Sequence, residues 1–190
     1  FSIAAERISF SYPGSEVQAI RDVTLHINAG ERIAIVGENG AGKTTLVKLL
    51  IGLYQPQAGR VRVNGSELTP EYAAGLVQPR VAVVFQDYAT YPLTARENIG
   101  FGDLARLWDD AALAGAAQRA GVREFIEGLP QKYDTYLGRQ FGETDLSGGQ
   151  WQKIALARAF LRDADLVVLD EPTAAMDPLA ELALFERFIE

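Results

Sequence analysis

A glycine-rich segment, set between an alternating apolar run and a helical pattern, constrains this chain more than any other feature. Gly37-Glu-Asn-Gly-Ala-Gly-Lys43-Thr44 fits the pattern G-x-x-x-x-G-K-[ST]. Residues 32–36 before it alternate like a strand, and leucines recur at helical spacing over residues 45–53 after it. Glycines let backbone amides turn toward an anion, and the positive end of the following helix attracts that anion. Because such a string arises by chance in only about 1% of chains of average composition, the segment predicts a phosphate-binding loop.

The last two residues of this segment carry groups that suit a nucleotide. The ammonium of Lys43 can reach β- and γ-phosphates, and the hydroxyl of Thr44 can bind Mg²⁺. The alternative is an ordinary glycine turn between a strand and a helix, which would bind nothing. The strand and helix patterns that flank the segment favour the phosphate loop.

Two carboxylates follow a second apolar run. Residues 166–169 predict a buried strand, and Asp170 and Glu171 come directly after it. Consecutive strand residues point in opposite directions, so one carboxylate can hold Mg²⁺ while the other faces an attacking water. We therefore assign Asp170 to magnesium and Glu171 to the general base. The alternative is a solvated acidic turn, which the phosphate loop elsewhere in the chain disfavours.

A second helix start also suits an anion. Leu146-Ser-Gly-Gly-Gln150 precedes a helical pattern over residues 151–159. Ser147 is a good N-cap, and the two glycines leave the first helical amides exposed. The alternative is a helix that is merely well capped. One phosphate-binding loop is enough for a soluble nucleotide hydrolase, so a second anion-binding site in the same chain calls for an explanation.

Apolar runs and helical patterns alternate along the chain, which predicts an α/β fold with a mostly parallel sheet and ligands at the strands' carboxyl ends. The expected strands are residues 8–12, 60–63, 81–85 and 166–169, with an Asn64-Gly65 turn after residue 63 and a hairpin of residues 23–27 and 32–36 around a turn at 28–31. The expected helix starts are Thr69-Pro70, the capping box of Thr94 with Glu97, and the alanine-rich residues 109–120. Strand patterns are absent from residues 88–160, which predicts an inserted helical lobe.

Composition excludes several classes of protein. The 190 residues include 18 Lys or Arg and 25 Asp or Glu, giving a net charge of −7, so no nucleic-acid partner is expected. There is no cysteine and one histidine, His26, which leaves no thiol chemistry and no multi-histidine metal site. We expect His26 to be structural. No apolar run is long enough to span a bilayer. The chain begins at Phe1 without a signal peptide, which suggests a piece of a longer protein.

With these motifs in place, the sequence resembles the ATP-binding cassette (ABC) ATPases along essentially its whole length. The family's motifs occur in order: Walker A at 37–44, the Q-loop at Gln86, the LSGGQ signature at 146–150, Walker B at 166–171 and the D-loop at 174–177. The resemblance implies a P-loop NTPase (RecA-like) core with an N-terminal antiparallel β subdomain and an inserted α-helical subdomain at about 88–160. It also implies two cassettes paired head to tail, so that the signature of one closes over ATP held by the other.

The resemblance further implies residue roles. Glu171, Lys43 and Gln86 would be catalytic, with Gln86 near Mg²⁺ and the water and sensing a membrane-spanning partner. Thr44, Gln86 and Asp170 would bind the metal. Ser147 and Gly149 would contact the γ-phosphate that is bound at Lys43 of the partner cassette. Asp177 would lie at the contact between the two cassettes. Tyr12 would stack on adenine; the alternative is an aromatic residue that only packs in the sheet. The implied nucleotide-binding residues are Tyr12, Gly37, Glu38, Asn39, Gly40, Ala41, Gly42, Lys43, Thr44, Thr45, Ser147, Gly148, Gly149 and Gln150.

Several segments are similar to ABC exporters, in which the cassette follows a membrane-spanning region. They are residues 11–14, 94–99 and 129–138. Two segments depart from the family: Gly138-Arg-Gln-Phe-Gly142 before the signature, and a D-loop with Met176. No histidine follows Glu171, although the family carries a switch histidine there on a further strand. We therefore expect the cassette to be C-terminally incomplete, with impaired activity as a fragment, and the full protein to continue past Glu190.

The leading hypothesis is the MgATP-hydrolysing cassette of an exporter at the cytoplasmic face of the cell (inner) membrane. A second cassette, identical or different, and a membrane-spanning domain fused upstream of Phe1 would be its partners. One alternative is a soluble ABC ATPase acting on ribosomes or DNA, which the net charge of −7 disfavours. Another is a regulatory cassette without hydrolysis, which Lys43, Asp170 and Glu171 disfavour. The cargo cannot be inferred from these residues.

Overall fold

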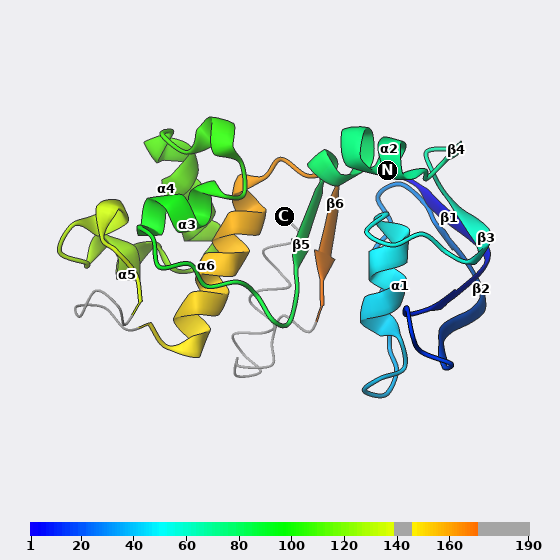
Figure 1. Ribbon diagram of the computed structural model, residues 1–190. Coiled ribbons are helices and arrows are strands. Elements are labelled where there is room, and N and C mark those ends of the chain that lie inside the picture. The colour runs from blue at the N-terminus through cyan, green and yellow to red at the C-terminus, as the bar shows by residue number, and fades with distance from the viewer. Residues whose placement is uncertain (139–145, 171–190) are drawn as a thin grey trace. The chain divides into compact units, whose positions relative to one another are not determined.

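A computed structural model describes residues 1–138 and 146–170 of the chain, and these form two compact units. The first unit contains Phe1–Val81 and Ala164–Leu166. The second contains, of the described residues, those from Ala82 to Asp163 and those from Val167 to Asp170. Each unit is described by itself, and Figure 1 gives the element labels used below.

The first unit is built on an antiparallel sheet. Its elements are β1 (Ile3–Ser11), β2 (Gln18–Ile27), α1 (Lys43–Leu50), β3 (Ala58–Val63), β4 (Ser66–Glu67), α2 (Pro70–Tyr72), a π-helical turn η1 (Ala73–Val77) and a 3₁₀ turn η2 (Gln78–Arg80). The strand order is β2-β1-β3-β4, and each neighbouring pair is antiparallel. This sheet confirms the antiparallel β region that was expected near the N-terminus.

Strand β1 is the centre of that sheet, and its inward residues alternate. Ile3, Ala5, Ile8 and Phe10 are all buried. The alternation of buried residues slips once, between Ala5 and Ile8, where Arg7 has a φ of 50° and the register of pairing with β2 shifts. A bulge of this kind adds one residue and bends the strand, which keeps both halves of β1 facing the same core. The predicted turn at residues 64–65 joins β3 to β4, with positive φ at both positions.

The predicted hairpin of residues 23–27 and 32–36 is wrong. Residues 23–27 do form a strand, as part of β2, but β2 pairs with β1 from Gln18 to Ile27, with shifts of register, and residues 32–36 form no strand in the described structure. The turn is also as expected, closed by the Glu31 N–H donating to the Asn28 carbonyl at 3.1 Å. Alternating apolar residues indicate a strand's two faces but not its neighbour, and a strand forms only where a neighbour supplies hydrogen bonds.

Helix α1 is displaced from the predicted residues 45–53. It begins two residues earlier, at Lys43, and it ends at Leu50. Gly52, with a φ of 74°, follows the C-cap Ile51 and stops the helix, because glycine enters the left-handed region without steric cost. Leu53 therefore lies beyond the helix and is 47% exposed. Leu49 and Leu50 are buried as predicted.

The second unit is mostly helical. Its elements are β5 (Val81–Val84), α3 (Ala95–Gly100), a 3₁₀ turn η3 (Leu104–Arg106), α4 (Asp110–Ala120), α5 (Arg123–Glu127), a 3₁₀ turn η4 (Lys132–Asp134), α6 (Gly148–Leu161) and β6 (Leu166–Leu169), with Val81 and Leu166 counted in the first unit. Helices α3 and α4 pack on α6, as Figure 1 shows. β5 pairs with β6. The Asp165 N–H donates to the Arg80 carbonyl and the Asp170 N–H donates to the Val84 carbonyl, so the two strands run parallel. Both strands were predicted.

Sequence signals for helix starts are confirmed at several positions. Thr69 caps α2 and Asp109 caps α4, each through its side-chain oxygen. Thr94 and Glu97 form the reciprocal capping box that opens α3. Within residues 88–138 and 146–160 the only strand-like pairing is an isolated bridge between Thr94 and Tyr136. The bounds of the inserted lobe, 88–160, stay a prediction.

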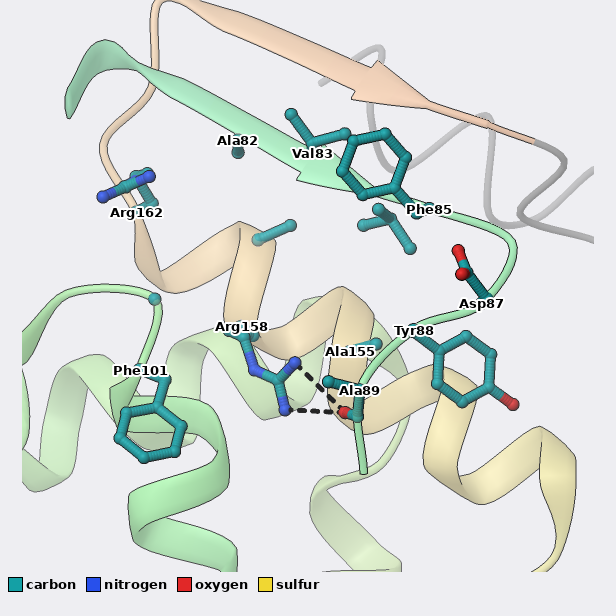
Figure 2. A pocket seen from close by; sticks show the side chains of 13 residues that line it. Ala82, Val83, Phe85, Asp87, Tyr88, Ala89, Phe101, Ala155, Arg158 and Arg162 are labelled. Carbon is teal, nitrogen blue, oxygen red and sulfur yellow. Dashed lines mark hydrogen bonds between the residues drawn. The ribbon is translucent and has the colours of Figure 1, made fainter. Parts of the chain in front are cut away.

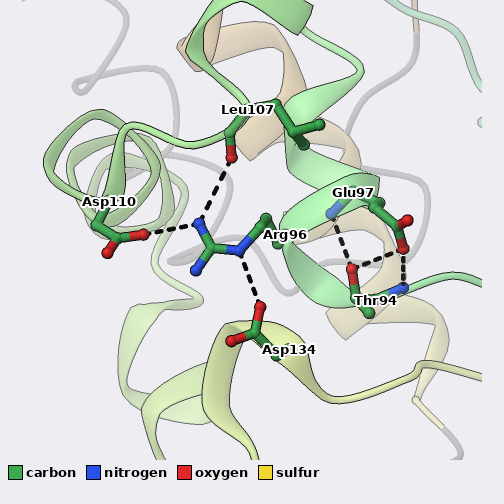
Figure 3. A network of polar contacts seen from close by, with 6 residues as sticks. All are labelled: Thr94, Arg96, Glu97, Leu107, Asp110 and Asp134. Atoms are coloured by element: carbon green, nitrogen blue, oxygen red, sulfur yellow. Dashed lines mark hydrogen bonds and ion pairs between the residues drawn. The ribbon is translucent and has the colours of Figure 1, made fainter.

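Arg96 holds three of these helical segments together. Its guanidinium is only 11% exposed and donates to Asp134 at 2.9 Å and to Asp110 at 2.7 Å (Figure 3). It also donates to the Leu107 carbonyl at 3.5 Å and lies 5.2 Å from the Trp108 ring centroid. The hydrogen bond to Asp134, and then that to Asp110, raise the pKa of Arg96. One cation therefore links α3 to η4 and to the start of α4.

In the described residues, no helix is long and apolar enough to cross a bilayer.

Candidate nucleotide-binding site

The predicted phosphate loop lies in the first unit, directly before α1. Lys43 bends back over it, and its ammonium donates to the Gly37 carbonyl at 2.9 Å and to the Glu38 carbonyl at 3.1 Å. Residues 37–41 are exposed. The N-cap of α1 is Gly42, so no side chain caps the helix, and its first turn has no acidic residue. The start of α1 therefore presents the positive end of the helix without a capping side chain or a nearby acidic residue, which suits a bound phosphate.

Gly42 is required at its position for two reasons. Its φ is 91°, and a Cβ there would lie 2.5 Å from the Ala19 carbonyl oxygen in β2. Gly40 is a matched control, because its φ is 82° but a Cβ would meet no atom within 4 Å. The close approach at Gly42 is what docks the start of α1 on β2.

We expect Gly42→Ala to lower the free energy of unfolding by about 2–4 kcal/mol, since backbone strain of about 1–2 kcal/mol adds to a clash that must displace backbone. Gly40→Ala should lower it by about 1–2 kcal/mol, from strain alone. Urea denaturation of both variants measures the difference. Equal losses would contradict the role of the contact with Ala19.

Tyr12 lies one residue beyond β1, beside the start of α1. Its hydroxyl is 2.9 Å from the hydroxyl of the buried Thr45, in the first turn of α1. Its ring is edge-on to those of Phe10 and Tyr54, with centroids 5.2 and 5.7 Å away. Tyr12 remains 36% exposed. The structure thus places a partly exposed tyrosine beside the first turn of α1, and its stacking on adenine stays a prediction. Sequence reasoning missed Tyr54, which only the folded sheet brings beside Tyr12.

The second predicted anion site lies in the second unit, at the start of α6. Ser147 is the N-cap: its Oγ accepts from the Gln150 N–H at 3.2 Å, while the Gln150 Oε1 accepts from the Ser147 N–H at 2.8 Å. The first turn of α6 has no acidic residue. Leu146 is buried and anchors the segment that enters the helix.

The two glycines of α6 are not required by packing against the described residues. A Cβ added to Gly148 or to Gly149 would meet no atom within 4 Å, and neither residue has a positive φ. Glycine within a helix costs about 0.5–1 kcal/mol relative to alanine. Packing among the described residues therefore does not explain why glycine stands at these two positions. The space over the helix start is open to a ligand.

The carboxyl ends of β5 and β6 carry the remaining described candidates. Gln86 is exposed, in a turn after β5, and Asp170 is 8% exposed, directly after β6. The Asp170 N–H donates to the Val84 carbonyl at 2.9 Å, which fixes the backbone from which its carboxylate projects. Glu171 and residues 174–177, including Asp177, lie outside the described residues. Because Asp170 and Thr44 belong to different units, the structure describes each half of the predicted magnesium site by itself.

A cavity of about 290 Å³ lies in the second unit behind the turn at Gln86. It lies between β5, the segment after it, Phe101 and the helix α6 (Figure 2). Arg158 of α6 donates to the Ala89 carbonyl through both terminal nitrogens at 3.3 Å, and to the Asn98 carbonyl at 2.9 Å. Burial lowers the pKa of Arg158. Sequence reasoning missed this residue, since nothing in a helical pattern marks an arginine as inward-facing.

Comparisons with known proteins agree with this architecture. A profile of the family described as "ABC transporter" matches residues 20–174. The chain is 44% identical over 185 residues to the nisin transport ATP-binding protein NisT of Lactococcus lactis subsp. lactis, covering 96% of this chain and 30% of that protein. It is 41% identical over 184 residues to an ATP-dependent lipid A-core flippase of Alkalilimnicola ehrlichii, covering 97% and 31%.

Among solved structures, a bacterial Atm1-family ABC exporter with ATP bound matches with a TM-score of 0.88 and 30% identity. The match covers 99% of this chain and 32% of that one. The chain thus spans about 30% of the length of these relatives. The P-loop NTPase fold predicted from the motifs is confirmed. The chain belongs to the ABC transporter family, as one of its ATP-binding domains.

Proposed function

We propose that this chain is the ATPase cassette of an ABC exporter, which binds MgATP between two cassettes and hydrolyses it to drive transport. The glycine-lined start of α6 carries the proposal, because a Cβ at Gly148 or Gly149 would meet no atom of the described residues, which leaves room there for an anion. Relatives named as transport proteins and flippases favour an exporter over a soluble ATPase. We place the cassette at the cytoplasmic face of the membrane, joined to a membrane-spanning region of the full protein.

In this proposal the phosphate loop binds the nucleotide first. The amides of residues 37–45 surround the phosphates, Lys43 moves from the loop carbonyls to the β- and γ-phosphate oxygens, and Tyr12 stacks on adenine. Stacking tolerates any base, so this contact favours ATP only weakly over GTP. Thr44, Asp170 and Gln86 would hold Mg²⁺, whose charge would neutralise that of the phosphates.

The second cassette would complete the site. Residues 147–150 of one copy would meet the γ-phosphate held by the other, with the Ser147 hydroxyl and the Gly149 amide as donors. Glu171 would take the proton from the attacking water, and Asp177 would lie at the contact between cassettes. The carboxylates and the lysine needed for hydrolysis are all present, which disfavours a purely regulatory cassette.

Paired cysteines test the arrangement in the full-length protein with any other cysteines replaced. With Asn39→Cys and Gly149→Cys together, we expect an intersubunit disulfide that forms with MgATP and not without nucleotide, because a disulfide requires Cβ atoms about 4 Å apart. Non-reducing electrophoresis measures the cross-linked fraction. Asn39→Cys paired with Gly115→Cys is the control, since Gly115 is also a helical glycine with open space around it. A cross-linked fraction that does not depend on ATP, or that is equal in the control pair, would contradict head-to-tail pairing.

A further inference from the structure

A tyrosine two residues after Gln86 contacts the start of α6. The Tyr88 hydroxyl donates to the Gly148 carbonyl at 2.8 Å, across sixty residues of sequence and within the second unit. Gly148 is the first residue of α6, next to the N-cap Ser147. The Tyr88 side chain is half-buried, and burial raises the pKa of Tyr88, so the hydroxyl stays protonated and can donate at neutral pH.

The residue after Tyr88 is held by the same helix. Arg158 donates to the Ala89 carbonyl, and Tyr88, Ala89 and Arg158 lie along α6 in Figure 2. Gly148 and Arg158 are ten residues apart, or about 15 Å along a helix. The segment that leaves the Gln86 turn is therefore fastened to α6 at two separated points. Gln86 itself is exposed and makes neither contact.

The contact at Gly148 bears on the geometry of the signature. Gly148 and Gly149 have no side chains through which neighbours could orient the helix start. The reciprocal bonds of Ser147 and Gln150 stay within the first turn. Among the described residues, the Tyr88 hydroxyl supplies a bond from a distant segment to this turn.

We propose that Tyr88 is a positioning residue: its hydroxyl ties the direction of the Ser147–Gly149 turn to the segment that follows Gln86. A displacement of the Gln86 turn would thereby reorient the donors offered to the partner cassette's nucleotide. This inference rests on the proposed function of the signature, but the bond itself and its effect on α6 can be tested without hydrolysis.

The test is Tyr88→Phe in the full-length protein, which removes one hydroxyl and keeps the ring. Tyr72→Phe is the matched control, because the Tyr72 hydroxyl also donates to a backbone carbonyl, that of Val63 at 3.4 Å, in the first unit. Hydrogen exchange read by mass spectrometry reports on the peptide covering residues 146–152. ATPase kinetics and Mg²⁺-free equilibrium binding of a fluorescent ATP analogue report on function.

In Tyr88→Phe we expect faster exchange in residues 146–152 without nucleotide, and a kcat about three- to tenfold lower, as for the loss of one net hydrogen bond. Analogue affinity should stay within about twofold, because a single cassette's phosphate loop does not use Tyr88, and Tyr72→Phe should change neither exchange there nor kcat. Unchanged exchange at the signature, or a loss of affinity equal to the loss of kcat, would overturn the proposal. If the unaltered protein hydrolyses no ATP, the proposed function fails, and the exchange comparison still decides the role of Tyr88.

Discussion

Glu171→Gln in the full-length protein is expected to lower ATP turnover by about 10²–10⁴-fold while ATP binding persists, because general-base catalysis contributes a factor of this size. Glutamine has nearly the same shape as glutamate but cannot accept the proton of the attacking water. Asp170, the residue before Glu171 in the sequence, follows β6 directly and is mostly buried.

Steady-state phosphate release and equilibrium ATP binding, measured on the same preparation, check this result. Glu124→Gln is a suitable control, since Glu124 is an exposed carboxylate in the first turn of α5 and should leave turnover near normal. Turnover that stays near normal in Glu171→Gln would remove Glu171 from the role of base. A parallel loss of ATP binding would instead indicate a structural role.

Lys43→Ala is expected to weaken nucleotide binding by about 10–100-fold, as hydrogen bonds to charged groups contribute about 1.5–3 kcal/mol. The loop is already folded around the ammonium, which accepts no bonds and donates to the carbonyls of Gly37 and Glu38. Removing the cation therefore takes away both a phosphate ligand and the group that shapes the loop. Lys43→Arg should recover little affinity, because a planar guanidinium does not fit the space of a compact ammonium.

Fluorescence titration with an ATP analogue measures these affinities. Lys48→Ala is the control from the same helix: Lys48 lies in the last turn of α1, 5.9 Å from the centroid of the Tyr54 ring. We expect the affinity of Lys48→Ala for the ATP analogue to stay close to that of the unaltered protein. An equal loss in both alanine variants would mean that net charge, and not the position of Lys43, governs binding.

Local signals in the sequence predicted local structure well. The capping box at Thr94, the cap at Ser147 and the turn at residues 64–65 all depend on residues within four positions of one another, and all are confirmed. Family membership and fold followed from motifs whose chemistry needs particular residues at fixed spacing. The roles of the individual site residues stay predictions.

Features that depend on distant residues could not be predicted. Alternation at residues 32–36 indicated a strand but could not reveal whether another strand would pair with it. The contact of Tyr88 with Gly148 joins residues 60 positions apart, and that of Arg158 with Ala89 joins residues 69 positions apart. A single sequence shows no sign of such pairs, because they are created by the packing of α6 against the segment after β5.

The hydrogen bond from Asp170 to the Val84 carbonyl has a mechanical consequence. Gln86 lies two residues after Val84, so this hydrogen bond joins the exposed turn to the backbone of the buried Asp170. A displacement of the turn by an outside contact would therefore reach the backbone of Asp170 through two residues and one hydrogen bond.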